Sequence, residues 1–384
     1  MKFNISGFKC LFVAAAALIA SGCSGGSVKA SEKMVADDGQ PQSADTAVST
    51  PEPQLLTLAL VGDIMMGTTF PDSVGGSHLP RNGGRNLFDD CRDMLLRADV
   101  AAGNLEGNLL DGPGRRRPMK NPATYFVFRM PTDYVGNLSE AGFDFLGLAN
   151  NHMNDFGEPG RASTVKTLTD AGLAHAGLKG RCETAIIERA GRRIGLTQFG
   201  HGGNNLDVTD LSELRRVVGE LREKADLVIV AFHGGAEGAK HCHVPFAKET
   251  FLGENRGDVV AFAHAAIDAG ADLVYGHGPH VPRAAELYKD HIIFYSLGNF
   301  CTPYRMNIAG TSGYAPLAEV TIDAEGRFVG GKIHSFIQQR GRGPVADPSN
   351  RAAQFISRMS REDFPQSALR IAPDGTLSVA RDEK

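Results

Sequence analysis

The chain contains repeated apolar runs that end in glycine and polar residues. The first run, LLTLALVGD (55–63), is continuous and ends in Gly-Asp, which is typical of a strand covered on both faces. The same form recurs further along the chain, in ADVAAGNLEG (98–107), FDFLGLANNH (143–152), ADLVIVAFHGG (225–235), ADLVYGHGPH (271–280) and HIIFYSLGNF (291–300). We therefore predict six buried strands.

Helical patterns and two hairpins separate these strands. Segment 209–225 places Leu211, Leu214, Val218 and Leu221 on one stripe, opened by Thr209 or Asp210 as the helix cap. Two more helices are predicted to stop at glycine, over 161–172 and 256–270. Segments 183–199 and 317–333 each read as a hairpin turning at a glycine. The pattern predicts a layered, mixed α/β domain.

Composition adds size and charge to this picture. The 384 residues are 42% hydrophobic and 22% charged, which is ordinary for a globular protein with ample chain to bury a core. The formal net charge of −4 gives no reason to expect nucleic acid as a partner. The chain is therefore expected to act on something other than nucleic acid.

The N-terminus predicts export and anchoring. Lys2 and Lys9 precede an apolar run (10–20) that is too short to span a bilayer comfortably, and small residues then lead to Cys23. Residues 1–22 resemble a bacterial lipoprotein signal, so we predict lipidation at Cys23 and a lipid-anchored, extracytoplasmic protein of the cell envelope. A plain secretory signal cut nearby is the alternative.

The remaining chain divides by composition. Residues 23–54 have few large apolar side chains and are rich in Ser, Ala, Asp and Pro, so we predict a disordered tether. The main domain is predicted over 55–340, and 341–384 is predicted as a helix and hairpin packing on it. Four isolated cysteines lack C-x-x-C spacing and argue against structural zinc, while their disulfide pairing stays open: Cys91, Cys182, Cys242 and Cys301.

Polar side chains gather where the predicted strands end. They are Asp63, Asn104, Glu106, Asn150, Asn151, His152, His233, Glu237, His277, His280 and Asn299. In open α/β sheets, ligands bind outside the carboxyl ends of the strands. Any one of these residues alone reads as an ordinary polar residue, but five agreeing strand ends favour a common site. Carboxylates, carboxamides and imidazoles together suit a divalent ion such as Mn, Fe or Zn.

Several of these segments carry a family resemblance. The blocks are GDIMMG, NLEGNL, AGFDFLGLANNHMNDFG, HGGAE, DLVYGHGPHV and IFYSLGNF. As an ordered set over about residues 55–305 they resemble the CapA capsule-synthesis family, which is associated with poly-γ-glutamate capsules and related to calcineurin-like metallophosphoesterases. The resemblance implies a four-layer αββα sandwich with a site at one edge of the paired sheets. It also implies other capsule-synthesis membrane proteins as partners.

The candidate site residues fall into three groups, some implied by the resemblance and the others by their place at strand ends or in the basic loop. The implied metal ligands, for one or two ions, are Asp63, Glu106, Asn151, His233, His277 and His280. The implied catalytic residues are His152, as the acid at the leaving group, and Glu237. Substrate binding is expected at Asn104, Arg115, Arg116, Arg117 and Asn299.

The chain departs from the phosphoesterase pattern at three positions. Met65 stands where those enzymes have a histidine two residues after the first aspartate. One extra residue precedes His280 in the closing motif, and Met153 replaces the acidic residue that follows Asn-His, with Asp155 nearby. One of two metal positions is therefore expected to be weaker or absent.

Three functions remain compatible with the sequence. A metal-bound water could attack a γ-linked glutamyl amide, in hydrolysis or transfer, or it could attack a phosphate ester. The protein could instead be a non-catalytic capsule component that holds or guides the polymer. The loop 111–122, with Arg115 to Arg117, would attract an anionic polymer such as poly-γ-glutamate, or it is simply a solvated basic loop.

The lipid anchor makes the first testable prediction. Cys23→Ser removes the thiol that would carry the lipid, so the variant should move from the membrane fraction to the soluble fraction. Fractionation followed by immunoblotting measures this. A variant that stays as firmly membrane-bound as the wild-type protein would refute lipidation at Cys23.

Overall fold

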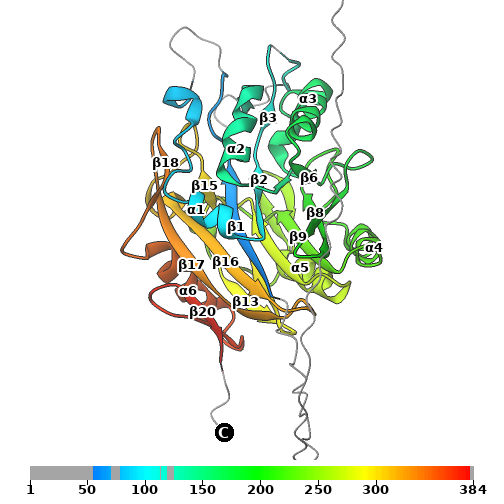
Figure 1. Ribbon diagram of the computed structural model, residues 1–384, viewed down its shortest axis with the longest axis vertical. Helices are drawn as coiled ribbons and strands as arrows, with labels where there is room; N and C mark the ends of the chain where they lie inside the picture. Colours follow the sequence, from blue (N-terminus) through cyan, green and yellow to red (C-terminus); the bar gives the residue numbers. More distant parts are fainter. Residues whose placement is uncertain (1–54, 71–77, 113, 119–124, 381–384) are drawn as a thin grey trace, which may run out of the picture. The chain divides into compact units, whose positions relative to one another are not determined.

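The computed structural model describes residues 55–70, 78–112, 114–118 and 125–380. The signal and tether predicted for residues 1–54 lie outside the described residues, and they are not considered further as structure. The described chain from residue 55 onward belongs to one compact unit. It is built on two β-sheets (Figure 1).

The larger sheet has ten strands within the described residues, in the order β19-β20-β17-β16-β1-β2-β5-β6, with β15 paired to β1 and β18 to β17. The segment β1-β2-β5-β6 is parallel, and β16 runs antiparallel to β1. The strands are β1 (Leu56–Ile64), β2 (Val100–Leu105), β5 (Phe145–Gly147), β6 (Ala174–Ala176), β15 (Asn299–Cys301), β16 (Tyr314–Ile322), β17 (Phe328–Gln339), β18 (Gly343–Ala346), β19 (Leu369–Ile371) and β20 (Thr376–Val379).

The smaller sheet has six strands in the described chain, ordered β13-β14-β12-β9-β8-β7. Its four central strands are parallel, and the two edge strands β13 and β7 are antiparallel. The strands are β7 (Thr184–Arg189), β8 (Arg192–Gly200), β9 (Leu227–His233), β12 (Leu273–His277), β13 (Ala285–Tyr288) and β14 (His291–Phe294). Two short ladders lie outside the sheets, β3 (Asn108–Leu109) with β4 (Arg129–Met130) and β10 (Glu249–Phe251) with β11 (Glu254–Gly257).

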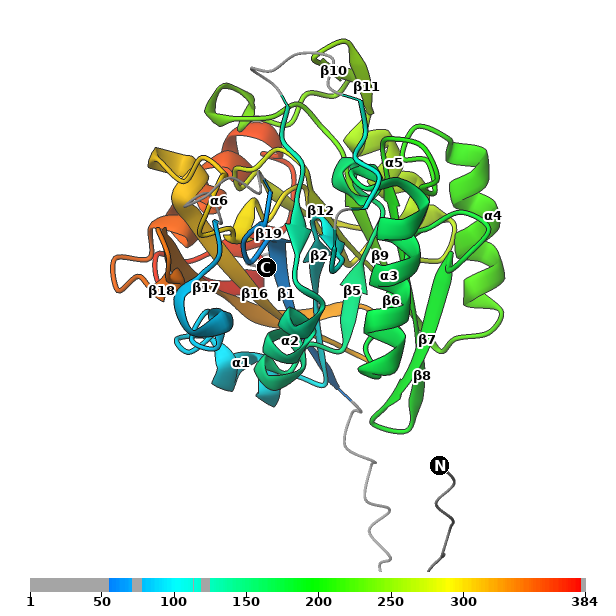
Figure 2. The ribbon, with the colours of Figure 1, turned by 90° about the horizontal axis from the view of Figure 1, so that it is seen from above.

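Helices cover the outer faces of both sheets. Three helices pack on the larger sheet: α1 (Arg92–Arg97), α2 (Val135–Ala141) and α3 (Gly157–Asp170). Two pack on the smaller sheet: α4 (Leu211–Arg222) and α5 (Val259–Asp268). Figure 2 shows α2 and α3 lying over the larger sheet, with α4 and α5 beside the smaller one. The order helix, sheet, sheet, helix confirms the predicted four-layer αββα architecture.

The main core lies between the sheets. Leu60 and Phe145 of the larger sheet meet Ile229 and Tyr275 of the smaller one, all at 0–1% exposure. Every residue of β2, β9 and β12 is buried. This agrees with the sequence, in which uninterrupted apolar runs predicted strands covered on both faces. All six predicted strands are present, and the last divides into β14 and β15.

The predicted helices and hairpins are also present. Asp210 caps α4, because its side chain accepts hydrogen bonds from the backbone N–H groups of Ser212 and Glu213. The hairpin β7–β8 turns at Gly191, where φ is +72°, and β16–β17 turns at Gly326, where φ is +75°. Glycine adopts this left-handed region without the steric cost that a Cβ would add.

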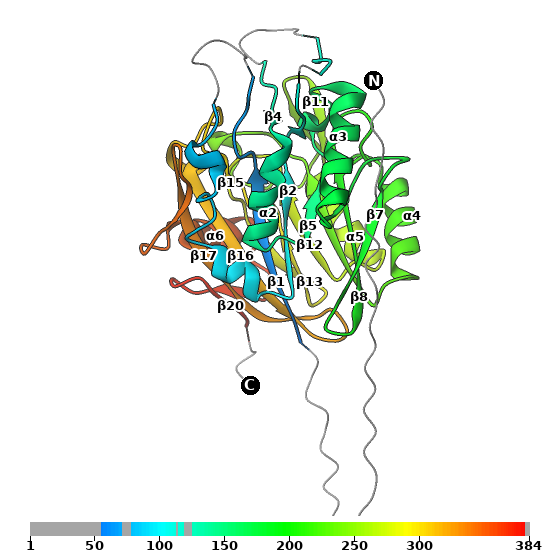
Figure 3. The ribbon, with the colours of Figure 1, turned by 45° about the horizontal axis from the view of Figure 1, so that its top comes forward.

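The helix and hairpin predicted after residue 340 join the larger sheet. Helix α6 (Arg351–Asp363) contacts β16 and β17 of the larger sheet and β13 of the smaller one. Strand β20 pairs with β17, so the hairpin β19–β20 extends the sheet (Figure 3). The residues after 340 thus form a helix and a hairpin that pack on the domain, within the same compact unit.

Two further findings concern the described chain only. None of its helices combines the length and the apolar character needed to cross a membrane. Its cysteines, Cys91, Cys182, Cys242 and Cys301, are all free thiols. The question of disulfide pairing is thus answered for these four residues, which do not pair with one another.

The inter-sheet core makes a stability prediction. Leu60→Ala should lower the free energy of unfolding by about 2–5 kcal/mol, because Leu60 is fully buried between the sheets and its truncation leaves a cavity. The matched control is Leu96→Ala on α1, where Leu96 is 58% exposed and the loss should stay near 0.5 kcal/mol. Urea unfolding of both variants measures the difference, and equal losses would contradict this arrangement of the core.

Candidate metal centre

Asp63 lies at the end of β1 and is fully buried. Its Oδ1 accepts a hydrogen bond from Asn104 Nδ2 at 2.8 Å, and its backbone N–H donates to the Gly298 carbonyl at 2.8 Å. The preceding Gly62 permits this approach, since a Cβ there would lie 2.0 Å from the Gly298 oxygen. Close packing of β1 against the β14–β15 connection therefore fixes the carboxylate at the edge of the sheet.

Three histidines surround this carboxylate. His233 and His277 end the parallel neighbours β9 and β12 and are paired in register. Their Nδ1 atoms lie 3.8 and 3.9 Å from Asp63 Oδ1, and His280 Nδ1 lies 3.0 Å from Asp63 Oδ2. The parallel register explains why His233 and His277 both face Asp63, because paired positions on adjacent parallel strands point to the same side of the sheet.

Glu106 completes the cluster from the loop after β2. Its Oε1 lies 3.7 Å from His280 Nε2 and 3.8 Å from His152 Nε2. Ligand atoms of Asp63, Glu106 and His280 all lie within 4.8 Å of one another. His280 Nδ1 must carry a proton, since it faces two acceptors, Asp63 Oδ2 and Asn299 Oδ1, each at 3.0 Å. Its Nε2 is therefore the ring nitrogen that would bind a metal ion, with loss of the proton that the neighbouring carboxylates favour.

Unsatisfied polar atoms mark the centre of this cluster. Both Glu106 carboxylate oxygens, both His277 ring nitrogens and His233 Nε2 are buried without a hydrogen-bond partner among the described residues. Native proteins rarely leave buried polar atoms unpaired, because desolvation without a partner costs free energy. These unpaired oxygen and nitrogen atoms are suitable ligands for a divalent cation such as Mn, Fe or Zn.

Electrostatics agree with that fit. Burial lowers the pKa of His277 to about 4 and that of His233 well below its usual value, so both rings are neutral with a lone pair available. Burial, followed by repulsion from Asp63, raises the pKa of Glu106 to about 7. Burial opposes a charge on His280, but the Glu106 and Asp63 carboxylates outweigh it and raise its pKa to about 10. A cation would relieve the repulsion between the two carboxylates.

Asn104 and Asn299 hold ligands in place. Asn104 is fully buried, and its Nδ2 donates a hydrogen bond to Asp63 Oδ1. Its Oδ1 accepts hydrogen bonds from Asn150 Nδ2 at 3.0 Å and from Gln198 Nε2 at 2.8 Å. These hydrogen bonds let Asn104 position Asp63, and its substrate-binding role stays a prediction. Asn299 Oδ1 accepts a hydrogen bond from His280 Nδ1 at 3.0 Å, and Asn299 also lines the adjoining cavity.

His152 lies beside the cluster with a defined orientation. Its Nδ1 lies 2.7 Å from Asp155 Oδ2, and Arg117 Nε donates to Asp155 Oδ1 at 2.8 Å. Burial opposes a charge on His152, but the Asp155 carboxylate outweighs this and raises the histidine's pKa. Asp155 is thus the acidic partner of His152, in place of the acidic residue that Met153 replaces in the sequence. His152 Nε2 is left facing Glu106.

The three arginines expected to bind polymer do not act as one group. The Arg117 guanidinium is held by Asp155 and by the Phe126 carbonyl, so Arg117 positions the His152 partner. Arg116 is exposed and lies 4.7 Å from the centre of the Phe70 ring, and Arg115 is exposed. The three side chains therefore have different surroundings, and polymer binding by Arg115, Arg116 and Arg117 stays a prediction.

A cavity of about 290 Å³ opens beside the centre. It is lined by Phe126, Phe128, His152, Glu237, Gly238, Phe251, His280, Asn299, Arg305, Met306, Asn307 and Ser312. Met65 packs against Phe128 and Met306, so an apolar contact takes the place of the histidine found in phosphoesterases. Glu237 borders the cavity but accepts a hydrogen bond from Arg256 Nη1 at 2.7 Å. Its predicted catalytic role stays a prediction.

The predicted ligand Asn151 opens the 3₁₀ turn η4 (Asn151–Asn154), next to His152. Its Oδ1 is buried without a hydrogen-bond partner in the described chain, as expected of a free ligand atom. Six predicted residues converge directly around the cluster: Asp63, Glu106, His152, His233, His277 and His280.

Sequence reasoning missed His201. Its ring lies 5.4 Å from that of His233, and its Nδ1 donates to the His233 carbonyl. Its buried Nε2 has no hydrogen-bond partner in the described part of the molecule and lies 3.9 Å from Glu254 Oε2. A signal was present, because Phe199-Gly200-His201 follows an apolar strand as Gly276-His277 does. Gln198, which supports Asn104, lies in the same segment.

The fold and the cluster together define a two-sheet α/β protein with a candidate metal centre at its strand ends. Comparison with known families makes this specific: residues 57–304 match the family described as Bacterial capsule synthesis protein PGA_cap. The chain belongs to this family. The resemblance seen in the ordered sequence blocks is thereby confirmed.

Individual relatives are more distant. The chain is 32% identical over 270 residues to Capsule biosynthesis protein CapA of Bacillus anthracis, covering 65% of this chain and 60% of that protein. It is 26% identical over 268 residues to PGA biosynthesis protein CapA of Bacillus subtilis, covering 66% and 65%. The matched region thus spans less than two thirds of either relative. The calcineurin-like phosphoesterase YfkN of Bacillus subtilis has a similar fold at 11% identity and a TM-score of 0.44, covering 81% of this chain and 97% of that one.

The cluster makes a prediction about metal content. His277→Ala should weaken binding of Mn²⁺ or Zn²⁺ by at least about tenfold, because it removes a buried ring with two unpartnered nitrogens. His334→Ala is the matched control, since His334 lies on β17 and pairs with Glu319. Elemental analysis after dialysis against defined metal measures both. Equal metal content in the two variants would contradict a metal centre at His277.

Proposed function

We propose that this protein is a metal-dependent enzyme of capsule polymer synthesis that hydrolyses or transfers a γ-glutamyl amide. The observation that carries the proposal is the set of buried, unpartnered oxygen and nitrogen atoms of Glu106, His233 and His277 around Asp63. A protein that only binds a polymer has no need of such a set, because unsatisfied buried atoms destabilise the fold.

The residues that would hold the ion are those of the cluster: Asp63, Glu106, Asn151, His233, His277 and His280. When bound, a divalent ion lowers the pKa of its water towards about 7 and polarises the bond under attack. The chain's own contribution is to hold the ligand atoms rigidly. Asn104 and Asn299 fix the directions of Asp63 and His280, as outer hydrogen-bond partners do in metalloenzymes.

His152 is the proposed proton donor. Its Nδ1 is held by Asp155, which leaves Nε2 at the cavity. A positioned imidazole can deliver a proton to a leaving nitrogen or oxygen, provided that its ring cannot rotate away. Arg117 keeps Asp155 in place, and Phe128 packs on the His152 ring with centroids 4.2 Å apart. These contacts hold the donor at one orientation.

The cavity suits a glutamyl unit. Phe126, Phe128 and Met306 provide an apolar wall for methylene groups. Arg305 also lines the cavity, with its guanidinium over the Phe126 ring at 5.5 Å from the ring centre, and it has no carboxylate partner within the described residues. An arginine in this state can bind a substrate carboxylate in a bidentate manner. A glutamyl unit offers both an aliphatic stem and such a carboxylate.

Location and partners belong to the same proposal. The lipoprotein-like N-terminus supports anchoring through Cys23, and membership of the capsule synthesis family supports action on poly-γ-glutamate beside other membrane proteins of capsule synthesis.

The proton donor gives the decisive test. His152→Ala should lower cleavage or transfer of poly-γ-glutamate by about 10²–10⁴-fold and leave bound metal near the wild-type amount, because His152 acts on the substrate. Product analysis by mass spectrometry and elemental analysis measure the two quantities. His175→Ala is the control, since His175 lies on β6 and contacts only the Leu173 carbonyl among the described residues.

Two outcomes would contradict the proposal. Wild-type protein that carries metal but cleaves only phosphate esters would show a phosphoesterase instead. A His152→Ala variant that supports normal polymer production would show that the protein acts without this proton donor, as a capsule component that binds the polymer.

A further inference from the structure

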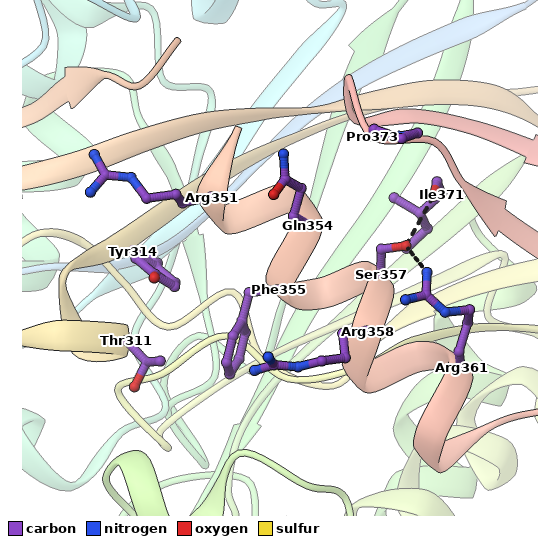
Figure 4. Close-up of a pocket in the computed structure, with 10 residues that line it drawn as sticks. All are labelled: Thr311, Tyr314, Arg351, Gln354, Phe355, Ser357, Arg358, Arg361, Ile371 and Pro373. Carbon is purple, nitrogen blue, oxygen red and sulfur yellow. Dashed lines mark hydrogen bonds between the residues drawn. The ribbon is translucent and has the colours of Figure 1, made fainter. Parts of the chain in front are cut away.

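A second cavity system lies along helix α6, on the other side of the segment η6 (Gly310–Gly313) from the metal centre. Its first part has a volume of about 670 Å³. The lining residues are Thr311, Tyr314, Arg351, Gln354, Phe355, Ser357, Arg358, Arg361, Ile371 and Pro373 (Figure 4). Three of the ten are arginines from one helix.

A neighbouring cavity of about 470 Å³ continues this one. Ser357, Arg361 and Ile371 line both cavities, and the second adds Arg370 from β19. We call the two together the α6 groove. From Arg351 to Arg361 the helix rises about 15 Å, so the groove is long enough for several units of an extended chain.

Two of the arginines are free to bind an anion. Arg358 and Arg361 are exposed and have no carboxylate partner within the described chain, whereas Arg351 is held by Asp347 at 3.0 Å. Positions 351, 358 and 361 are separated by seven and three residues, which keeps their side chains along one side of the helix. The groove therefore concentrates positive charge on a protein whose net charge is −4.

Both free arginines are already oriented. The Arg358 guanidinium lies 5.1 Å from the centre of the Phe355 ring, and Figure 4 shows the two side chains next to each other. Arg361 Nη1 donates to Ser357 Oγ at 2.8 Å, which uses one of its five N–H groups. Side chains held in this way lose less conformational entropy on binding than free ones.

The α6 groove and the metal-centre cavity are lined by neighbouring residues of η6. Thr311 lines the groove, while its neighbour Ser312 lines the metal-centre cavity. Thr311 Oγ1 is buried with no hydrogen-bond partner in the described part of the chain. Because Thr311 and Ser312 are adjacent in the chain, a polymer bound in the groove would lie next to the metal-centre cavity.

We propose that the α6 groove binds an anionic polymer with a carboxylate on each unit and holds it beside the metal centre. Arg358 and Arg361 pair with carboxylates of successive units, in the charge-assisted geometry that guanidinium and carboxylate favour. Phe355 and Ile371 contact the aliphatic part of the chain. This inference rests on the proposed function, because it takes the same polymer as ligand.

Binding of labelled poly-γ-glutamate to the full-length protein, measured by fluorescence anisotropy, tests the groove. The double variant Arg358→Gln/Arg361→Gln should bind about fivefold more weakly at low salt, and its affinity should depend less on salt. The control is Arg215→Gln/Arg216→Gln, which removes the same charge from exposed positions of α4. It should bind within about twofold of wild type.

Equal weakening of both double variants would overturn the proposal, because net charge alone would then explain binding. Unchanged binding by Arg358→Gln/Arg361→Gln would overturn it too. Vesicles containing phosphatidylglycerol serve as a second probe: tighter binding to vesicles than to polymer, lost in the groove variant, would identify a lipid headgroup as the ligand instead.

Failure of the proposed function is distinguishable from failure of the groove. His152→Ala lies outside the α6 groove and should retain polymer binding while losing turnover. If wild-type protein shows no turnover but the groove variant loses polymer binding, the groove proposal stands and the enzymatic proposal falls. If turnover requires His152 but binding ignores the groove arginines, the reverse holds.

Discussion

The structure depends on the burial of one carboxylate, Asp63, at the end of the central strand β1. A carboxylate removed from water is costly unless hydrogen bonds or opposite charge compensate it. Here Asn104 and His280 supply direct contacts at 2.8 and 3.0 Å. The surrounding ligands are arranged about this compensated charge.

The second carboxylate, Glu106, makes the cluster suited to a cation. Glu106 is buried near Asp63, and neither of its oxygens has a hydrogen-bond partner in the described residues. Two buried carboxylates repel each other, and one protonated histidine does not satisfy all four oxygens. The neutral rings of His233 and His277 add lone pairs instead of charge, which is the arrangement that a divalent ion requires.

The two-sheet fold is what brings these groups together. Asp63 and Glu106 follow strands of the larger sheet, whereas His233 and His277 end strands of the smaller one. All of these strands are parallel to a neighbour in their own sheet, so their carboxyl ends meet at one rim. The packed core between the sheets fixes the distance between the two sets.

Much of this arrangement could be predicted from sequence. Apolar runs ending in polar residues located Asp63, His233 and His277, because a buried strand has a strong pattern and its end faces the rim. Glycine turns located both hairpins. The cap of α4 was narrowed to Thr209 or Asp210, because a short polar side chain before an amphipathic stripe commonly caps a helix, and the structure shows that Asp210 is the cap.

The contacts between distant side chains could not be predicted. The hydrogen bonds of Asn104 were not foreseen, since an exposed and a buried amide look the same in sequence. Arg117 was grouped with its basic neighbours, because nothing local shows that Asp155 lies 2.8 Å from its Nε. The α6 groove was missed for the same reason: it depends on β19 and η6 packing against the helix.

The central claim is that these side chains bind a divalent ion. Anomalous X-ray diffraction from crystals soaked in Mn²⁺ or Zn²⁺ tests it most directly. We predict an anomalous peak among Asp63, Glu106, His233 and His277, with ligand distances of about 2.0–2.3 Å for a zinc-like ion. A difference map without a peak there, at metal concentrations that occupy other sites, would contradict the account.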